Sequence, residues 1–316
     1  MALGFGANAR LMAAFETTYG SPPLDGYHRL GFSRYGLSAR QPLLDNDLLG
    51  EGRDPAPAVL GALTCDGEVT VPCDARQIGF WLKALLGEPT TTGTTNFTHS
   101  FQSGGANIPS LSLQAINPDV PLRRTHFGAR IDSFTLPLKR DGLTSATLSL
   151  IAQGESTDSV DRDLTPVSYN ALRFGSFQGT IRRNGAAMGR VVSAEIVYKN
   201  GLDRIETIRS DGLIDSAEPT VAACTGNIVV RVDGTALIEA ATAGTPMELD
   251  FGYVRDANTS LIFTVHEAVL SRPSVPIEGP SGIQVTFEFR GAKDPTLGRM
   301  MTAILKNDVA TYGATP

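Results

Sequence analysis

CDGEVTVPCD at residues 65–74 returns as CTGNIVVRVD at residues 224–233, so cysteine, glycine, two β-branched residues and aspartate recur at one spacing. Each position of the second copy lies 159 residues after its counterpart. Apolar residues alternate with mostly polar ones in both stretches, which is the pattern of a strand with one buried face. A period this long indicates a duplicated domain rather than a solenoid of short repeats.

Weaker similarity continues on both sides of the two stretches. Upstream, residues 44–55 resemble residues 208–219 at a separation of 164, which implies five extra residues in the first copy. Downstream, Asp74 and Asp233 each precede a helical pattern that ends at a glycine, and Gln77 stands where a capping box places Glu or Gln. Two strands should then end each copy, at about 129–139 and 144–153, and at about 265–277 and 283–290, the second pair with a turn at 278–282.

The pattern therefore predicts a mainly β protein with two tandem modules, residues 1–160 and residues 161–316. Each module should carry one flanking α-helix. The first should begin with an N-terminal arm or loop. The second should close with a helix between Asp294 and Asp308, because no third module remains after it.

Composition excludes several classes of protein. The chain has 316 residues, 41% of them hydrophobic, enough for two ordinary cores, and its net charge of −6 offers no basic surface for gripping nucleic acid. The first twenty residues lack the features of a signal peptide, and no apolar stretch is long enough to span a bilayer. Cytoplasmic synthesis without membrane insertion is expected. An extended strand would hold Cys65 and Cys73 about 26 Å apart, so we expect free, buried thiols.

A hairpin signal occurs at Tyr198, Lys199, Asn200, Gly201 and Leu202, where Asn-Gly suits a type I′ turn. The run from Val191 to Arg209 would then form a two-stranded arm. The matching region of the first half, about 25–55, reads as a loop. Such an arm could contact a neighbouring subunit, and a plain surface hairpin fits the residues equally well.

Polar side chains occupy alternate positions in the strands that end each copy. They are Ser145, Thr147, Ser149, Thr286 and Glu288. The simpler interpretation is the solvated outer face of a sandwich. The sharper one is a surface shared between subunits around a water-filled channel. Arg231 and Arg290 suit a channel wall only if they pair with acids or face outward.

No catalytic, cofactor-binding or metal-binding constellation stands out. The four histidines, His28, His99, His126 and His266, lack metal-ligand spacing. The motifs of serine hydrolases, P-loops, zinc proteases and dinucleotide-binding folds do not occur. A carbohydrate-binding or adhesive β-sandwich remains an alternative, although Trp81, the one tryptophan, lies on a predicted helix. An enzyme with its site between the modules is the other alternative.

Several stretches in order resemble a known family: ETTYGSPP at 16–23, GEVTV at 67–71, FWLKALLG at 80–87, IPSLSL at 108–113 and GARIDSFTL at 128–136. They are similar to the major tail tube proteins of long-tailed, siphovirus-like bacteriophages, in the larger class with duplicated modules. The resemblance covers most of the first half and continues more weakly through the second. No single motif carries it; the order of several does.

The resemblance implies a structural virion protein without enzymatic activity or cofactor. Its β-sandwich modules would share an inner β-barrel, three chains would form a pseudo-hexameric ring, and stacked rings would form the tail tube for DNA ejection. Implied partners are further copies of the chain, a tape-measure protein, tail terminator and distal tail proteins, and double-stranded DNA in transit. Its place would be the virion tail, assembled in the host cytoplasm. A non-contractile tail is favoured and a contractile one is the alternative. No outer immunoglobulin-like domain is expected.

Overall fold

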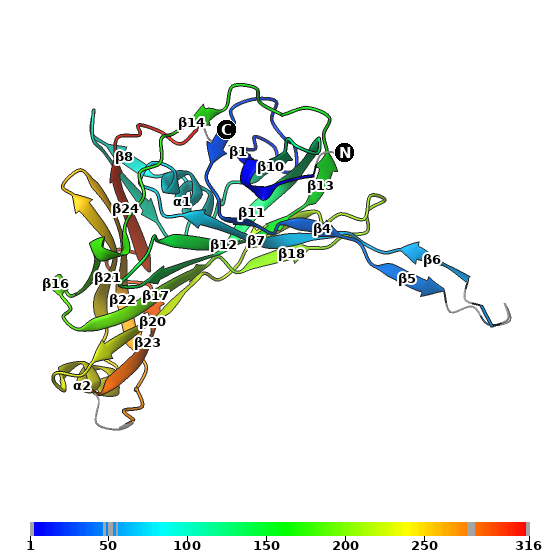
Figure 1. Cartoon of the computed structure of the whole chain (residues 1–316). Coiled ribbons are helices and arrows are strands. Elements are labelled where there is room, and N and C mark those ends of the chain that lie inside the picture. Colours follow the sequence, from blue (N-terminus) through cyan, green and yellow to red (C-terminus); the bar gives the residue numbers. More distant parts are fainter. Residues whose placement is uncertain (1–2, 47–48, 50–52, 55, 277–281, 314–316) are drawn as a thin grey trace.

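The computed structural model describes residues 3–46, 49, 53–54, 56–276 and 282–313. An inner sheet of eight antiparallel positions runs through both halves of the chain (Figure 1). Its order is β3/β4, β7, β12, β11, β17, β20, β23 and β22. The bounds are β3 Arg34–Tyr35, β4 Ser38–Arg40, β7 Thr64–Pro72, β11 Leu122–Leu138, β12 Ser145–Ala152, β17 Val191–Lys199, β20 Ala223–Arg231, β22 Thr259–Leu270 and β23 Gln284–Ala292.

A second layer covers the buried side of this sheet. In the first half the order is β2, β1, β10, β11 and β13, and in the second it is β15, β21, β22, β24 and β9. The bounds are β1 Arg10–Phe15, β2 His28–Leu30, β9 Phe97–Gln102, β10 Leu111–Asn117, β13 Gly154–Thr157, β15 Gly179–Arg183, β21 Met247–Asp256 and β24 Met301–Asn307. Both long strands, β11 and β22, serve the outer layer with their first part and the inner sheet with their last.

Short elements complete the chain. The strands β8 Thr90–Thr92, β14 Val167–Ser168 and β16 Ala186–Ala187 extend the outer layer, beside the 3₁₀ turns η1 Gly6–Asn8 and η2 Ser176–Gln178. Two hairpins, β5 Leu43–Asn46 with β6 Ala56–Leu60 and β18 Leu202–Ile205 with β19 Ser216–Pro219, form separate two-stranded sheets. The helices are α1 Ile78–Leu86 and α2 Ala236–Ala243. The mainly β, two-layer architecture confirms the predicted fold class.

The duplicated glycine has a steric cause. A Cβ atom on Gly67 would lie 2.3 Å from the carbonyl oxygen of Gly36, and one on Gly226 would lie 2.0 Å from that of Glu195. Both oxygens belong to the strand segment that pairs with the glycine's own strand. Any larger residue would push these backbones apart, so the motif keeps glycine wherever the first two strands of a module meet.

The register shows that the duplication is more regular than the sequence similarity suggested. Ala39 pairs with Cys65, and Tyr198 pairs with Cys224. In the hairpins, Leu43 pairs with Leu60 and Leu202 with Pro219. Every one of these pairs repeats at a separation of 159 residues. The five extra residues inferred for the first copy are therefore wrong, because chance similarity between arm residues had shifted the alignment.

The predicted hairpin at Tyr198–Leu202 is also wrong. Tyr198 is buried in β17, between β20 and β11. The side-chain amide of Asn200 donates to the carbonyl oxygens of Leu85, at 3.0 Å, and Ile131, at 2.8 Å. Asn200 and Gly201 thus mark the point where the chain leaves the sheet and enters the β18–β19 hairpin. The first half, predicted to have only a loop there, carries the matching β5–β6 hairpin.

The predicted C-terminal helix between Asp294 and Asp308 is a strand. Met301, Ala303 and Leu305 in β24 are completely buried, and β24 pairs with β22 on one side and β9 on the other. Apolar residues also stand on the other face of β24, where Ile304 is half-buried, and periodicity cannot distinguish such a nearly continuous apolar run from a buried helix. The turn predicted at residues 278–282 lies, except for its last residue, outside the described residues.

Helix α1 lies in the core as its apolar spacing predicted, with Ile78, Trp81, Leu82 and Leu85 all buried. The fully buried carboxylate of Asp74 accepts from the backbone N–H of Arg76, at 2.9 Å, and of Gln77, at 3.1 Å, just before the helix. The Gln77 side chain does not complete a capping box; its Oε1 accepts from Gly31 N instead, at 2.7 Å.

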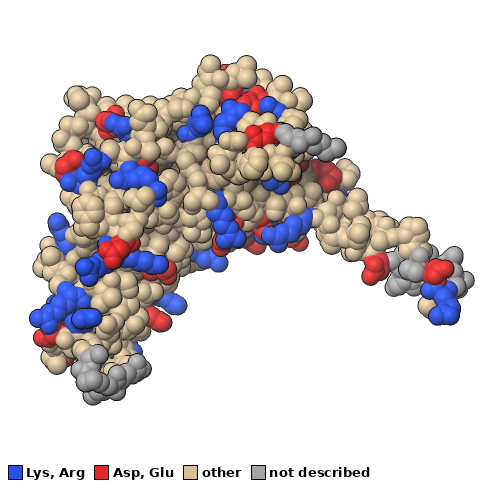
Figure 2. Space-filling view, viewed as in Figure 1, with Lys and Arg blue, Asp and Glu red and all other residues tan. Residues whose placement is uncertain are grey.

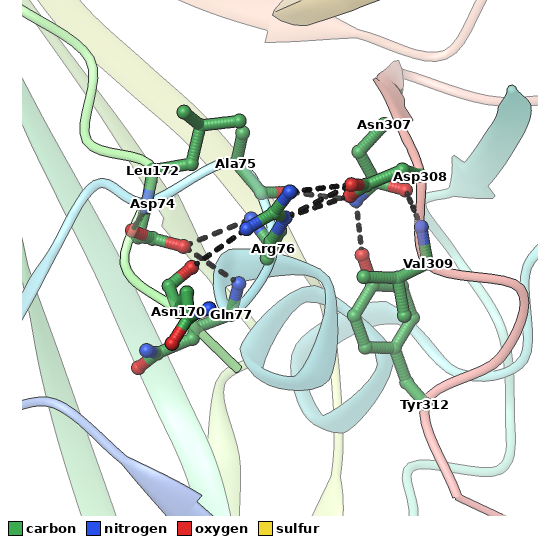
Figure 3. A network of polar contacts seen from close by, with 10 residues as sticks. All are labelled: Asp74, Ala75, Arg76, Gln77, Asn170, Leu172, Asn307, Asp308, Val309 and Tyr312. Carbon is green, nitrogen blue, oxygen red and sulfur yellow. Dashed lines mark hydrogen bonds and ion pairs between the residues drawn. The ribbon is translucent and has the colours of Figure 1, made fainter. Parts of the chain in front are cut away.

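Figure 3 shows how this aspartate also joins distant segments. Its second oxygen accepts from the backbone N–H of Leu172, in the segment between the two halves. Beside it, Arg76 forms a bidentate ion pair with Asp308, with Nη2 2.6 Å from Oδ2, and Nη1 donates to the Asn170 carbonyl. Asn307 donates to the Ala75 carbonyl at 2.6 Å. The start of α1 is therefore fixed to both the linker and the C-terminal strand.

Asp233, the repeat counterpart of Asp74, has a different role. It is exposed and forms a surface ion pair with Arg190 at 3.3 Å. Helix α2 begins after Thr235, without a side-chain cap. The repeat kept the aspartate, but only the first copy uses it as a buried cap.

Candidate assembly surfaces

The solvent-facing side of the inner sheet carries all five polar residues singled out in the sequence. Ser145, Thr147 and Ser149 are half-buried and Thr286 and Glu288 are exposed, while the residues between them, such as Leu148 and Phe287, are buried. The register places them on one face, because cross-strand partners in a sheet point to the same side. The structure thus brings residues from both halves onto one surface.

Two arginines on this face, Arg34 and Arg40, have acidic neighbours. Arg34 lies 3.9 Å from Glu68, and Arg40 lies 3.9 Å from Asp66. Arg204 also contacts Asp66. Arg231 and Arg290 are exposed on the same side. Opposite charges interspersed in this way leave a hydrated surface of mixed sign, without a continuous basic track.

Among the residues that the structure describes, no strand pairs with the outer side of either end of the inner sheet, so both ends are open edges. At one end, the backbone of residues 34–40 pairs with β7 on one side only, and the Ala39 N–H on the other side donates to the Glu155 carboxylate at 3.3 Å. At the other end, the chain continues beyond β22 through residues 271–276, where Ser271 N still donates to Glu288 O at 2.8 Å. Within the chain, the corresponding boundary is closed, because β11 of the first half pairs with β17 of the second.

The β18–β19 hairpin, hereafter the second arm, lies against the first half of its own chain. Its Glu218 forms an ion pair with Arg130 at 2.8 Å, and Arg130 also donates to the Ala217 carbonyl at 2.6 Å. Arg204 contacts Asp66 on the neighbouring part of the sheet. Gln153 donates to the carbonyl oxygens of Ile214 and Asp215 near the arm's tip. The second arm is thus fixed at its base and near its tip.

The β5–β6 hairpin, hereafter the first arm, projects from the body instead (Figure 1). Leu43, Leu44, Val59 and Leu60 are 68%, 54%, 61% and 61% exposed. Figure 2 shows that most of the arm between the body and its tip is free of charged side chains. Because Leu43 pairs with Leu60 and Leu44 with Val59, each face of the hairpin exposes two aliphatic side chains, and exposed apolar surface of this kind marks protein contacts.

A hollow of about 640 Å³ lies on the solvent-facing side of the second half. Its lining includes Thr225, Val269, Phe289, Arg290 and Ala292. Thr225 pairs with Arg290, and Arg290 with Val269, so these three form one row across the sheet. The matching row in the first half is Asp66, Ile151 and Arg130, which the second arm covers.

The buried titratable groups are structural. Burial raises the pKa of the Cys65, Cys73 and Cys224 thiols to about 12, and all three cysteines are free. Burial lowers the pKa of His28 to about 4, and it also lowers that of His99, which contacts Asn307 and Val309 O. Within the described part of the chain, no three His, Cys, Asp or Glu residues group as a metal site would require.

The described residues contain no helix that is both long and apolar enough to cross a membrane.

Sequence reasoning missed the first arm and both sheet edges. The signal for the arm was present, since the 159-residue separation holds from Arg34 to Asp74, but the two arms share almost no residue types.

Comparison with known proteins identifies the family of this chain. No curated protein matches the chain. Residues 6–291 match the family described as phage tail tube protein, which covers nearly the whole chain and both duplicated halves. That family is structural, in agreement with the two-layer β architecture and with the apolar arm and open sheet edges that a self-assembling subunit requires. The chain therefore belongs to the phage tail tube protein family.

Proposed function

We propose that three copies of this chain close into a ring whose inner wall is one continuous β-barrel, and that such rings stack into the tube through which DNA leaves the virion. The observation that carries the proposal is a unit of four strand positions in the inner sheet that occurs twice per chain. The first unit is β3/β4, β7, β12 and β11, and the second is β17, β20, β23 and β22. The β11–β17 junction joins the two units inside the chain. An equivalent junction between chains would leave no open edge.

The register of the internal junction specifies the external one. Phe134 pairs with Tyr198, and Leu136 with Ile196, across β11 and β17. In the first half Ser133 faces Ser149, and in the second half Ser271 N donates to Glu288 O at the matching place. Counted from these two positions, and without the bulge that lies between Ile131 and Ser133 in the first half, Arg272 of one chain would pair with Ala39 of the next, and Ser274 with Leu37. Because Ser271 N points toward β23, the alternation of a strand directs the N–H groups of 272 and 274 to the free edge.

A proline scan tests this junction. Ser274→Pro removes a donor from the expected interface, whereas Val275→Pro adds the same residue one position away, where the N–H points back into its own sheet. We expect Val275→Pro to retain rings and tubes in electron micrographs and Ser274→Pro to yield single chains. Equal assembly of both variants would refute the register, and a wild-type chain that stays monomeric at high concentration would refute the ring.

The solvent-facing residues Ser145, Thr147, Ser149, Thr286 and Glu288 would then line the lumen. Hydroxyl groups and the acid-paired Arg34 and Arg40 would bind DNA phosphates weakly, and weak binding allows the duplex to slide. The tape-measure protein would occupy this lumen before ejection, while tail terminator and distal tail proteins would bind the two end rings. A map of the assembled tube that resolves side chains and places these residues on the outer wall would contradict the lumen assignment.

The duplicated modules, residues 1–160 and 161–316, would act as two of six equivalent positions in the ring. Their separation is not complete, because β9 of the first half pairs with β24 of the second. This crossing would hold the two modules of one chain in a fixed relation. We further propose assembly in the host cytoplasm, since each ring needs only further copies of the same chain.

A further inference from the structure

We propose that the first arm docks in the hollow on the second half of the neighbouring copy, in the position that the second arm occupies on the first half of its own chain. The proposal rests on the proposed ring and adds the contact that selects the neighbour. The occupant is a second copy of this chain, and its contact residues follow from the internal contact.

The two arms correspond in sequence position and in the pairing of their base residues. Leu44 pairs with Val59 in the first arm where Asp203 pairs with Glu218 in the second, and both pairs are 159 residues apart. By the same separation, Asp45 corresponds to Arg204. The arms therefore share their register at the base, whereas the register of the first arm shifts between Leu44 and Asn46, beside Asp45. They also differ in the chemistry of their side chains.

The rows of sheet residues that the two arms would cover differ in a way that matches the difference between the arms. On the first half, Arg130 receives Glu218 of the second arm as an ion pair. The equivalent residue on the second half is Val269, and the arm residue that would reach it is Val59. Both members of the ion pair inside the chain thus have an aliphatic counterpart in the contact between chains, and these two valines would bury apolar surface instead.

The second contact changes in the same way. Inside the chain, the arm residue Arg204 contacts Asp66 in the sheet. In the corresponding contact between chains, the arm would offer Asp45. The row it meets holds Thr225 beside Arg290, where the first half has Asp66 beside Ile151. The arm residue changes from a cation to an anion, and the sheet exchanges the anion Asp66 for the neutral Thr225 with the cation Arg290 beside it. Glu195 and Glu288 also line the hollow, so Arg290 is the residue that Asp45 would pair with.

These paired differences also make the interaction selective. If the first arm met a first-half row, Val59 would cover Arg130 and Asp45 would face Asp66, leaving a desolvated cation and two like charges together. Such mismatches disfavour the wrong partner. The second arm already fills that row. The hollow on the second half is the corresponding place that remains open within one chain.

A charge exchange tests the contact. Val59→Glu alone should raise the concentration needed for assembly more than about tenfold, because it places a carboxylate against Val269. Val269→Arg alone should do the same. The double variant recreates the Arg130–Glu218 pair at the new interface and should restore assembly to within a few-fold of the wild type. Single variants that assemble normally, or a double variant no better than either single one, would overturn the proposal.

Cross-linking separates this contact from ring formation itself. A chain with Val59→Cys and Val269→Cys, treated with a short bismaleimide, should give covalent dimers and trimers, while either single variant should not link arm to sheet. The three native thiols are buried and would stay unmodified. Rings that form without a 59–269 link would overturn the docking while leaving the proposed function intact. A wild-type chain that forms no rings would overturn the proposed function.

Both tests need folded chains. Val59 is 61% exposed, so its substitution leaves the core unchanged. Circular dichroism and thermal unfolding of dispersed single chains should match the wild type for every variant. Val254→Glu, at an exposed position outside the hollow, serves as the control for added charge and should assemble as the wild type does.

Discussion

Asp74 and Asp233 occupy the same position of the repeat, and we expect their removal to have very different effects on stability. The Asp74 carboxylate is fully buried and accepts from three backbone N–H groups, those of Arg76, Gln77 and Leu172. Asp74→Ala leaves all three without that acceptor. Each loss costs about 1–3 kcal/mol, so for three groups we expect about 3–9 kcal/mol together.

This loss should be measurable by heat and by denaturant. A chain of 316 residues has an unfolding entropy of roughly 0.66 kcal/mol/K at about 2.1 cal/mol/K per residue, so the midpoint should fall by about 5–14 °C. Urea unfolding of dispersed single chains, followed by circular dichroism, provides the free energy. Asp74→Asn should lose about half as much, since it retains the oxygen that accepts from Arg76 and Gln77.

Asp233→Ala is the matched control. Its carboxylate is 54% exposed and pairs with an exposed Arg190, and such surface pairs contribute about 0–1 kcal/mol. The reasoning fails if both alanine variants lose the same stability, or if Asp74→Ala costs less than about 1 kcal/mol. Either result would mean that the network in Figure 3 does not hold α1 to the linker and the last strand.

Three further predictions concern the strand junction, pH and the lumen. Gly226→Ala should destabilise the chain by about 1–3 kcal/mol in urea unfolding, because its Cβ would meet a backbone oxygen, whereas Gly234→Ala, with open space around it, should stay within about 0.5 kcal/mol of the wild type. Burial lowers the pKa of His28 to about 4, so between about pH 6.5 and 4 the unfolded chain binds more protons than the folded one, and the free energy of unfolding should decrease as the pH is lowered through that window. His28→Phe should flatten that part of the pH-stability curve, and an unchanged slope would count against this role of His28. Thr147→Arg should slow DNA ejection without preventing tube assembly, and ejection at the wild-type rate would argue that Thr147 does not face the lumen.

The sequence by itself determined the duplication, the buried face of the first repeat strand and the position of α1. Cysteine, glycine and valine alternate in a pattern that local geometry enforces, and Ile78, Trp81, Leu82 and Leu85 recur at helical spacing. These signals are local, because they depend on which side of one strand or helix an individual residue occupies. The family resemblance added an expected architecture, and the match to residues 6–291 confirmed the family.

Only the tertiary structure decided which segments are arms and which are sheet. Tyr198 to Leu202 has the composition of a hairpin turn, yet Tyr198 pairs on both sides inside the sheet, and the true arms begin at Leu43 and Leu202. The last strand, β24, reads as a helix because apolar residues on both of its faces mask the alternation. Strand pairing joins residues that are far apart in the sequence, so the register, the open edges and the hollow that matches the first arm exist only once the chain has folded.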